Sequence, residues 1–246
     1  MCTATYLPLS PAGFILTHSR DEKRLRPAAL PPRTVSLHDQ RVTFPQDPQG
    51  QGTWIATSVQ TTLCILNGAF IAHQPQPPYK HSRGLVVVHY FDYPSVDAFA
   101  EDYDFRGIEP FTLLVMEAGR LVELRWNGHR LFVHEKDPQQ PHIWSSVTLY
   151  APDVIEKRER WFRDWLSQHS KPTVSGIRQF HHAAGDGDPE NSLRMNRRAA
   201  FGQGALLTLS LTSVVHDEAG LDMVYDDFTQ PISYRQLLNP PAYAAA

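Results

Sequence analysis

The chain has 246 residues, of which 41% are hydrophobic and 20% are charged, and its formal net charge is −3 at pH 7. This composition is ordinary for a soluble globular protein, and the length predicts one large domain or two small ones. The net charge gives no support for nucleic acid or an anionic membrane as a bulk partner. No stretch approaches the ~20 apolar residues of a membrane span.

The chain contains two cysteines, Cys2 and Cys64. A secreted disulfide scaffold would need more, and neither cysteine belongs to a C-x-x-C pair of the kind that binds zinc. A Cys2–Cys64 bridge stays open at this point. The first residues lack the basic start and the unbroken apolar run of a signal peptide. We therefore expect a cytoplasmic protein that needs no metal and no cofactor.

Apolar patterning predicts four strands in the first part of the chain: residues 2–9, 14–19, 53–57 and 63–67. The first two flank a turn at Pro11-Ala12-Gly13, which predicts a hairpin. The last two are rich in β-branched and aromatic residues, which favour strands. Between the pairs, Pro27, Pro31 and Pro32 predict a loop that crosses the surface or lines a cleft. The loop at residues 72–84 is the second predicted cleft wall.

An almost continuous apolar run at residues 85–90 predicts a strand buried on both faces. Asn127-Gly128 is the strongest turn signal in the chain and predicts a hairpin. This hairpin covers residues 121–134, and further strands are expected at residues 111–116, 205–215 and 221–225. Residues 183–190 predict a polar loop.

Two helices are expected between these strands. Ser95 predicts the cap of a short helix through Tyr103. The best helix covers residues 153–169, where Asp153 can cap. Its core-facing residues recur at helical spacing: Val154, Arg158, Trp161, Phe162 and Trp165. The aromatic residues of this stripe are interpreted as core packed against a sheet.

Strands open and close the chain, with few helices between them. This order favours a layered α+β domain over alternating βαβ units. We expect a single domain over residues 1–240, followed by a loose C-terminal tail over residues 241–246.

Cys2 lies directly behind Met1. Removal of Met1 would leave a cysteine that carries both a free α-amine, with a pKa of ~7.7–8.0, and a thiol, with a pKa of ~8.5. At neutral pH the amine can act as general base toward the thiol, directly or through one water. On position alone, the commoner interpretation is a small residue at a frayed chain start.

Motifs further along the chain change that interpretation. Ser19-Arg20-Asp21-Glu22, Arg26-Pro27 and Gly50-Gln51-Gly52-Thr53-Trp54 resemble motifs of the NRDE family, also called the transport and Golgi organisation 2 family. The likeness covers roughly residues 1–70, and Ser19 replaces the first residue of the family's Asn-Arg-Asp-Glu motif. The family resembles the N-terminal nucleophile (Ntn) hydrolases, in particular the choloylglycine hydrolase and penicillin acylase-like branch. The resemblance implies an αββα four-layer sandwich of two antiparallel sheets.

The resemblance also implies catalytic roles for four residues. Cys2 would be the nucleophile, and Asp21 would accept a hydrogen bond from the α-amine. Arg20 would orient the thiol and favour its thiolate, and Asn67 would donate to the oxyanion. From the residues alone, Arg20 and Asp21 end the strand that pairs with the Cys2 strand, so they lie within plausible reach. The alternatives are a surface ion pair for Arg20 and Asp21, and a turn residue before Gly68 for Asn67.

The choloylglycine-type enzymes carry a second site asparagine about two thirds along the chain. This sequence has Ser145, Ser146 and Thr148 in that region. Two functions from different classes are therefore expected. The first is an amide hydrolase or acyltransferase that acts on a carbon–nitrogen bond of a small-molecule substrate through a Cys2 thioester after removal of Met1. The second is a non-catalytic binding or trafficking protein on the same fold, for example for a non-covalently held haem or a lipid-like ligand.

Histidines suggest two further candidate sites, a Cys-His dyad and a metal site. His18 could form a Cys-His dyad but is interpreted as a packed strand residue. His181-His182 with Asp186 and Asp188 could suggest a metal site, but these are interpreted as exposed loop residues.

Overall fold

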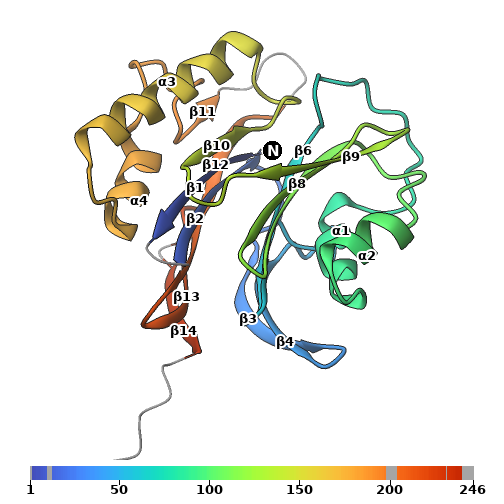
Figure 1. Cartoon of the computed structure of the whole chain (residues 1–246). Helices are drawn as coiled ribbons and strands as arrows, with labels where there is room; N and C mark the ends of the chain where they lie inside the picture. Colours follow the sequence, from blue (N-terminus) through green and yellow to red (C-terminus); the bar gives the residue numbers. More distant parts are fainter. Residues whose placement is uncertain (1, 10–12, 198–203, 231, 240–246) are drawn as a thin grey trace, which may run out of the picture.

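In the computed structural model, the described residues (2–9, 13–197, 204–230 and 232–239) form two stacked antiparallel sheets with helices outside them (Figure 1). In spatial order, the first sheet contains β10 (His142–Ser145), β1 (Cys2–Leu9), β2 (Gly13–Lys23), β12 (Leu206–Asp217), β13 (Gly220–Asp227) and β14 (Ile232–Asn239), with β11 (Asn196–Arg197) beside β12. The second contains β3 (Leu30–Leu37), β4 (Gln40–Gln46), β5 (Ile55–Thr57), β6 (Thr61–Asn67), β7 (Phe111–Glu117), β8 (Arg120–Trp126) and β9 (Leu131–Lys136).

The helices form the outer layers. The helices α1 (Arg83–His89) and α2 (Val96–Asp102), joined by the 3₁₀ turn η1 (Tyr90–Asp92), lie outside the second sheet, and α3 (Pro152–Gln168) and α4 (Val174–Ala183) lie outside the first (Figure 1). The predicted α+β fold, with two antiparallel sheets between helical layers, is confirmed. Among the described residues, no helix is both long enough and apolar enough to span a membrane.

Alternation along the β1–β2 hairpin assigns each side chain to one of two cores. The strands pair Cys2 with Arg20 and Tyr6 with Leu16. Cys2, Tyr6 and Leu16 belong to the core between the sheets, whereas Leu7 belongs to the core under α3 and α4. Because successive strand residues point to opposite faces, this register places Cys2 in the interior between the two sheets.

The predicted strand at residues 85–90 is wrong: the segment forms α1 and the start of η1. A short apolar run does not distinguish a buried strand from a buried helix. Val86 and Val87 are fully buried, and α1 packs on β5 and β6. This tertiary packing outweighs the low helix propensity of valine, which costs at most ~0.7 kcal/mol per residue.

The predicted proline loop is also partly wrong, because β3 begins at Leu30 and runs through Pro31 and Pro32. Among the described strands, β3 lies at the end of the second sheet, and its pairing with β4 is irregular between Leu30 and Arg33. An edge strand at an irregularity tolerates residues that cannot donate a main-chain hydrogen bond.

The helix signals are confirmed in part. Ser95 caps α2, since its Oγ accepts from the Ala98 N–H at 3.2 Å. In α3 the capping position is Ala151 rather than Asp153. The helix α4 lies in a segment with no predicted element. The aromatic stripe of α3 packs as predicted, because Phe162 is buried beneath the helix. The predicted tail at residues 241–246 lies outside the described residues, and the domain boundary at residue 240 stays a prediction.

Candidate active site at the start of the first strand

Three of the four predicted site residues line one pocket of about 250 Å³. Cys2 begins β1, Arg20 lies opposite it on β2, and Asn67 ends β6 in the facing sheet. We call this the charged pocket, since its wall also includes five further charged side chains: Glu22, Arg26, Asp47, Arg83 and Glu109. The two sheets therefore bring together residues from three separate parts of the chain.

The Cys2 thiol is buried, with 3% of the residue exposed. Burial raises the pKa of this thiol, and the negative charge of Asp21 adds to the effect. The thiol is therefore protonated at neutral pH. A nucleophile in this environment needs a base that removes its proton.

Arg20 contacts the aromatic and acidic parts of the charged pocket. Its guanidinium carbon lies 4.4 Å from the ring centroid of Trp54, and its Nη2 lies 3.5 Å from Oδ2 of Asp47. Arg26 donates from Nε to the same oxygen at 3.1 Å. Burial alone would raise the pKa of Asp47, but the hydrogen bonds and charges of Arg26 and Arg20 lower it below its usual value. Asp47 thus stays ionised and holds the two arginines.

Trp54 is positioned by the glycine motif that precedes it. The Thr53 N–H donates to the carbonyl of Gly84 at 3.1 Å, at the start of α1. A Cβ atom on Gly52 would lie 2.2 Å from the carbonyl carbon of Gly84, so a side chain at position 52 has no room. The motif allows two backbones to touch, and it places Trp54 and Ser82 in the wall of the charged pocket.

Asp21, the fourth predicted site residue, points to the opposite face of β2. It is fully buried, and its carboxylate accepts hydrogen bonds from the Tyr150 hydroxyl and from Thr208 Oγ1. Burial raises the pKa of Asp21, while the charge of Arg158 and the two hydrogen bonds lower it in part. Asp21 therefore lies behind Cys2 and does not line the charged pocket.

Arg158 on α3 is a further buried residue of this region, and its position in the sequence predicts core packing and no functional role. It is fully buried, and its guanidinium carbon lies 3.6 Å from the ring centroid of Tyr150. It donates to Thr3 Oγ1 on β1, to the carbonyl of Asn191 at 3.0 Å and to that of Ser192 at 2.7 Å. The sequence feature that could have indicated this buried role is the position of Arg158 within the apolar stripe of a predicted helix. A long charged side chain at such a position requires buried partners.

Ser146 connects the two strand ends that carry Cys2 and Asn67. Its N–H donates to the Cys2 carbonyl at 2.9 Å, and its Oγ donates to the Asn67 carbonyl at 2.8 Å. Asn67 also precedes Gly68, which has φ +83°, so it is a turn residue as well as a pocket residue. Among the described residues, no hydrogen bond involves the side-chain amide of Asn67. Ser146, in the region of the expected second asparagine, thus orders the main chain around the site.

One buried histidine, His18, lies on the β1–β2 hairpin, and another, His181, contacts the hairpin from outside. The prediction of an exposed loop is wrong for His181, which lies on α4 and is 2% exposed. Its Nε2 and Nδ1 lie 2.8 Å from Thr5 Oγ1 and Ser19 Oγ respectively. His18 is packed between the sheets, as predicted, and burial lowers its pKa well below the usual value. Among the described residues, no group of three or more His, Cys, Asp or Glu side chains could hold a metal ion.

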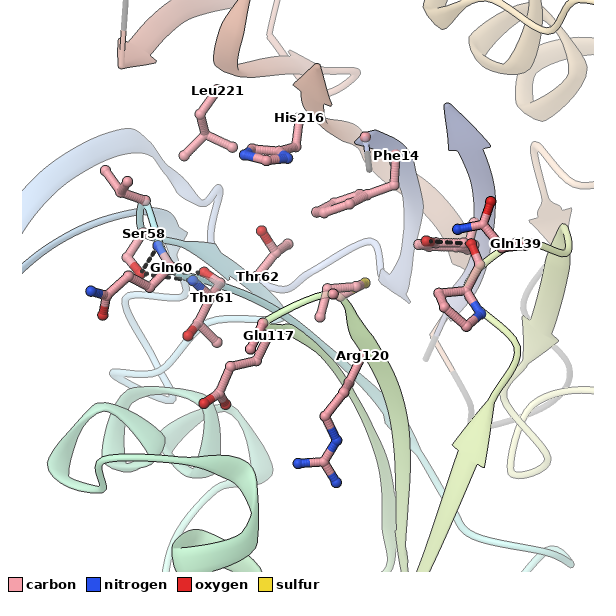
Figure 2. Close-up of a pocket in the computed structure, with 17 residues that line it drawn as sticks. Phe14, Ser58, Gln60, Thr61, Thr62, Glu117, Arg120, Gln139, His216 and Leu221 are labelled. Atoms are coloured by element: carbon pink, nitrogen blue, oxygen red, sulfur yellow. Dashed lines mark hydrogen bonds between the residues drawn. The ribbon is translucent and has the colours of Figure 1, made fainter. Parts of the chain in front are cut away.

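A second pocket, of about 570 Å³, lies toward the other end of the hairpin (Figure 2). Phe14 and His216 come from the first sheet, with ring centroids 5.7 Å apart, and they face Thr61 and Thr62 of the second. Phe14 pairs with Pro8 near the end of β1, far along the strand from Cys2. None of the four predicted site residues is among the described residues of its wall.

The two stacked antiparallel sheets with outer helices define an α+β fold of the Ntn-hydrolase type. A variant of the conjugated bile acid hydrolase from Clostridium perfringens has a similar structure, with a TM-score of 0.59 and 10% sequence identity over 96% of this chain and 92% of that chain. Penicillin V acylase from Agrobacterium tumefaciens gives a TM-score of 0.56 and 9% identity over 95% and 85% of the two chains. At these identities the likeness concerns the fold.

The particular family follows from the sequence. The profile of the family "Transport and Golgi organisation 2" matches residues 1–198, and the chain belongs to this family. The resemblance found in the first 70 residues is therefore confirmed and extends beyond them. No curated protein matches the chain.

Proposed function

We propose that this protein is an N-terminal-cysteine hydrolase that cleaves carbon–nitrogen bonds in small amides. The supporting observation is the shared pocket of Cys2 and Asn67, with the thiol at the start of an inner strand. Removal of Met1 would place an α-amine on the same residue as this thiol. Because burial raises the pKa of the thiol, this mechanism requires a neighbouring base that removes its proton.

The reaction then has two halves. The α-amine takes the thiol proton, Sγ of Cys2 attacks the amide carbon, and the Asn67 amide donates to the developing oxyanion. The carbon–nitrogen bond breaks as the amine half leaves with a proton, and the acyl half stays as a thioester on Cys2. Water attacks this thioester, which releases a carboxylic acid and restores the thiol.

Asp21 and Arg20 support the site from two sides in this proposal. Asp21, held by Tyr150 and Thr208 behind the strand, provides the negative charge that favours an α-ammonium group between the two proton transfers. Arg20, stacked on Trp54, provides positive charge at the pocket wall. A cytoplasmic location belongs to the same proposal, because a reducing compartment keeps a nucleophilic cysteine free.

A non-catalytic carrier of haem or a lipid-like ligand is the second candidate function. The observation that favours it is a groove of about 760 Å³, with exposed Phe70 and Ile71 in its wall. Such a groove can hold an apolar ligand without any use of a thiol.

The intact mass of the purified protein tests the first step, since complete retention of Met1 would rule out the α-amine mechanism. An electrophilic amide or β-lactam probe then tests the nucleophile. We expect Cys2→Ala to lose labelling and Cys64→Ala to keep it. Cys64 is a matched control, because it is also buried and burial raises its pKa well above the usual value. Labelling that persists in Cys2→Ala and disappears in Cys64→Ala would assign the reactive thiol to Cys64.

A further inference from the structure

A groove of about 760 Å³ begins at Asn67 and runs between the segment after β6 and the start of α3. We call it the apolar groove; its wall includes Phe70, Ile71, Trp144, Leu149 and Ile155. Phe70 is 44% exposed and Ile71 is 78% exposed, although both are large and apolar. The size is in the range of small-molecule sites. Large exposed apolar side chains around a concave site indicate that the groove receives an apolar ligand.

The charged residues that line the apolar groove are one arginine, Arg125, and two glutamates, Glu156 and Glu159. Arg125 donates from Nε to Glu123 Oε1 at 2.9 Å, so its charge is paired. Its guanidinium carbon lies 5.1 Å from the ring centroid of Phe70, which holds that ring in the wall. Glu156 and Glu159 from α3 also line the groove. These acidic residues disfavour a ligand that carries an anionic group at its far end.

Asn67 lines both the apolar groove and the charged pocket. The predicted oxyanion donor therefore lies where a pocket lined by charged side chains meets a groove lined by apolar side chains. On one side are Cys2, Arg83 and Glu109, and on the other are apolar side chains. A substrate whose carbonyl lies at this junction extends one half into each site.

We propose that the substrates are N-acyl amines with an apolar acyl half in the apolar groove and a small charged amine half in the charged pocket, an assignment that rests on the proposed hydrolase function. The orientation of the substrate, with its acyl half in the apolar groove, follows from the second half-reaction. After the carbon–nitrogen bond breaks, the acyl half stays on Sγ of Cys2, and the amine half leaves with the proton. Water must then reach the thioester carbon. It can fill a vacated polar pocket, whereas a vacated apolar groove would hold it poorly.

Binding to the Cys2→Ala variant tests the assignment without any need for turnover. The probes are N-acetylglycine, N-hexanoylglycine and N-decanoylglycine, titrated calorimetrically below micellar concentrations. Each buried methylene should tighten binding about fourfold, so hexanoylglycine, with its additional methylenes, should bind about 250-fold more tightly than acetylglycine. Equal affinities across the series would overturn the assignment.

Variants in the same Cys2→Ala background locate the acyl half. Ile71→Ser and Phe70→Ser should each weaken decanoylglycine binding several-fold and leave acetylglycine binding unchanged. Val59→Ser is the matched control, since Val59 is 59% exposed and lines the pocket of Figure 2 instead. The assignment would be overturned if Val59→Ser weakened decanoylglycine binding as much as the groove variants do. It would also be overturned if neither groove variant weakened decanoylglycine binding, since the acyl chain would then bind elsewhere.

Mass spectrometry of the protein with an intact Cys2 separates this assignment from the hydrolase function. Acyl-enzyme formation that increases with chain length supports both. Equal acyl-enzyme formation from acetyl and decanoyl substrates supports the hydrolase and overturns the groove assignment. Chain-length-dependent binding without any acyl-enzyme or product overturns the hydrolase, and with it the substrate assignment, and leaves a carrier of apolar ligands.

Discussion

Acidification should destabilise this protein through His181, which connects α4 to the β1–β2 hairpin beneath the site. The imidazole is buried, and its two nitrogens lie at hydrogen-bond distance from Thr5 Oγ1 and Ser19 Oγ. Burial lowers the pKa of His181 to about 3, and the positive charges of Arg178 and Arg158 contribute to the shift. The folded protein therefore keeps this histidine neutral at mildly acidic pH.

The sign of the pH dependence follows from the two pKa values. An unfolded histidine has a pKa of about 6.5, whereas folded His181 has a pKa of about 3. Between these values the unfolded chain binds the extra proton, so this contribution is fully present above pH 6.5 and is lost as the pH falls toward 3. Since one pKa unit corresponds to about 1.4 kcal/mol, the loss should be roughly 2 kcal/mol at pH 5.

Urea denaturation at several pH values between 7 and 5 measures this loss. The His181→Gln variant, which cannot take up a proton, should lose about 2 kcal/mol less free energy of unfolding between pH 7 and pH 5 than the wild type. His129→Gln is the control, since His129 is exposed, and its pH dependence should match the wild type. If His181→Gln and the wild type lose stability in parallel, the buried imidazole does not titrate as described.

Three further predictions concern the site and its supports. Arg158→Met should lower the free energy of unfolding by about 3–5 kcal/mol in denaturant titrations, because it leaves the buried Asp21 carboxylate without its cationic neighbour; a loss below about 1 kcal/mol would contradict this role. Gly52→Ala should destabilise by about 1–3 kcal/mol, measured in the same way, because its Cβ would displace Gly84, and unchanged stability would show that the two backbones can separate freely. Asn67→Ala should slow acylation of the nucleophile by about 10²–10³-fold with little change in melting temperature, and an unchanged rate would remove this residue from the oxyanion site.

The parts of the fold that local patterning specifies were predictable. The predicted hairpin placed Cys2 near the Arg20 end of β2, and Asn127-Gly128 marked the turn between β8 and β9. Ser95 marked the start of α2. Each of these features depends on a turn, a cap or a hairpin between neighbouring strands, so local propensity and periodicity were sufficient.

The failures came where distant packing outweighed local preference. The apolar run at residues 85–90 forms a helix because α1 packs against the second sheet. Pro31 and Pro32 are part of a strand because β3 lies at a sheet edge. His181 is buried because α4 covers the hairpin, which no pattern around the histidine predicted.

The sequence by itself determined the nucleophile candidate, its hairpin and the family motifs, since all of these lie close together near the start of the chain. Only the tertiary structure decided that Asn67 reaches the same pocket as Cys2, and that Asp21 lies behind the strand with Arg158 nearby. It also decided that Asn67 joins the charged pocket to the apolar groove. These relations depend on how two sheets stack and how α3 covers one of them. Residues far apart in sequence meet only when that packing is complete.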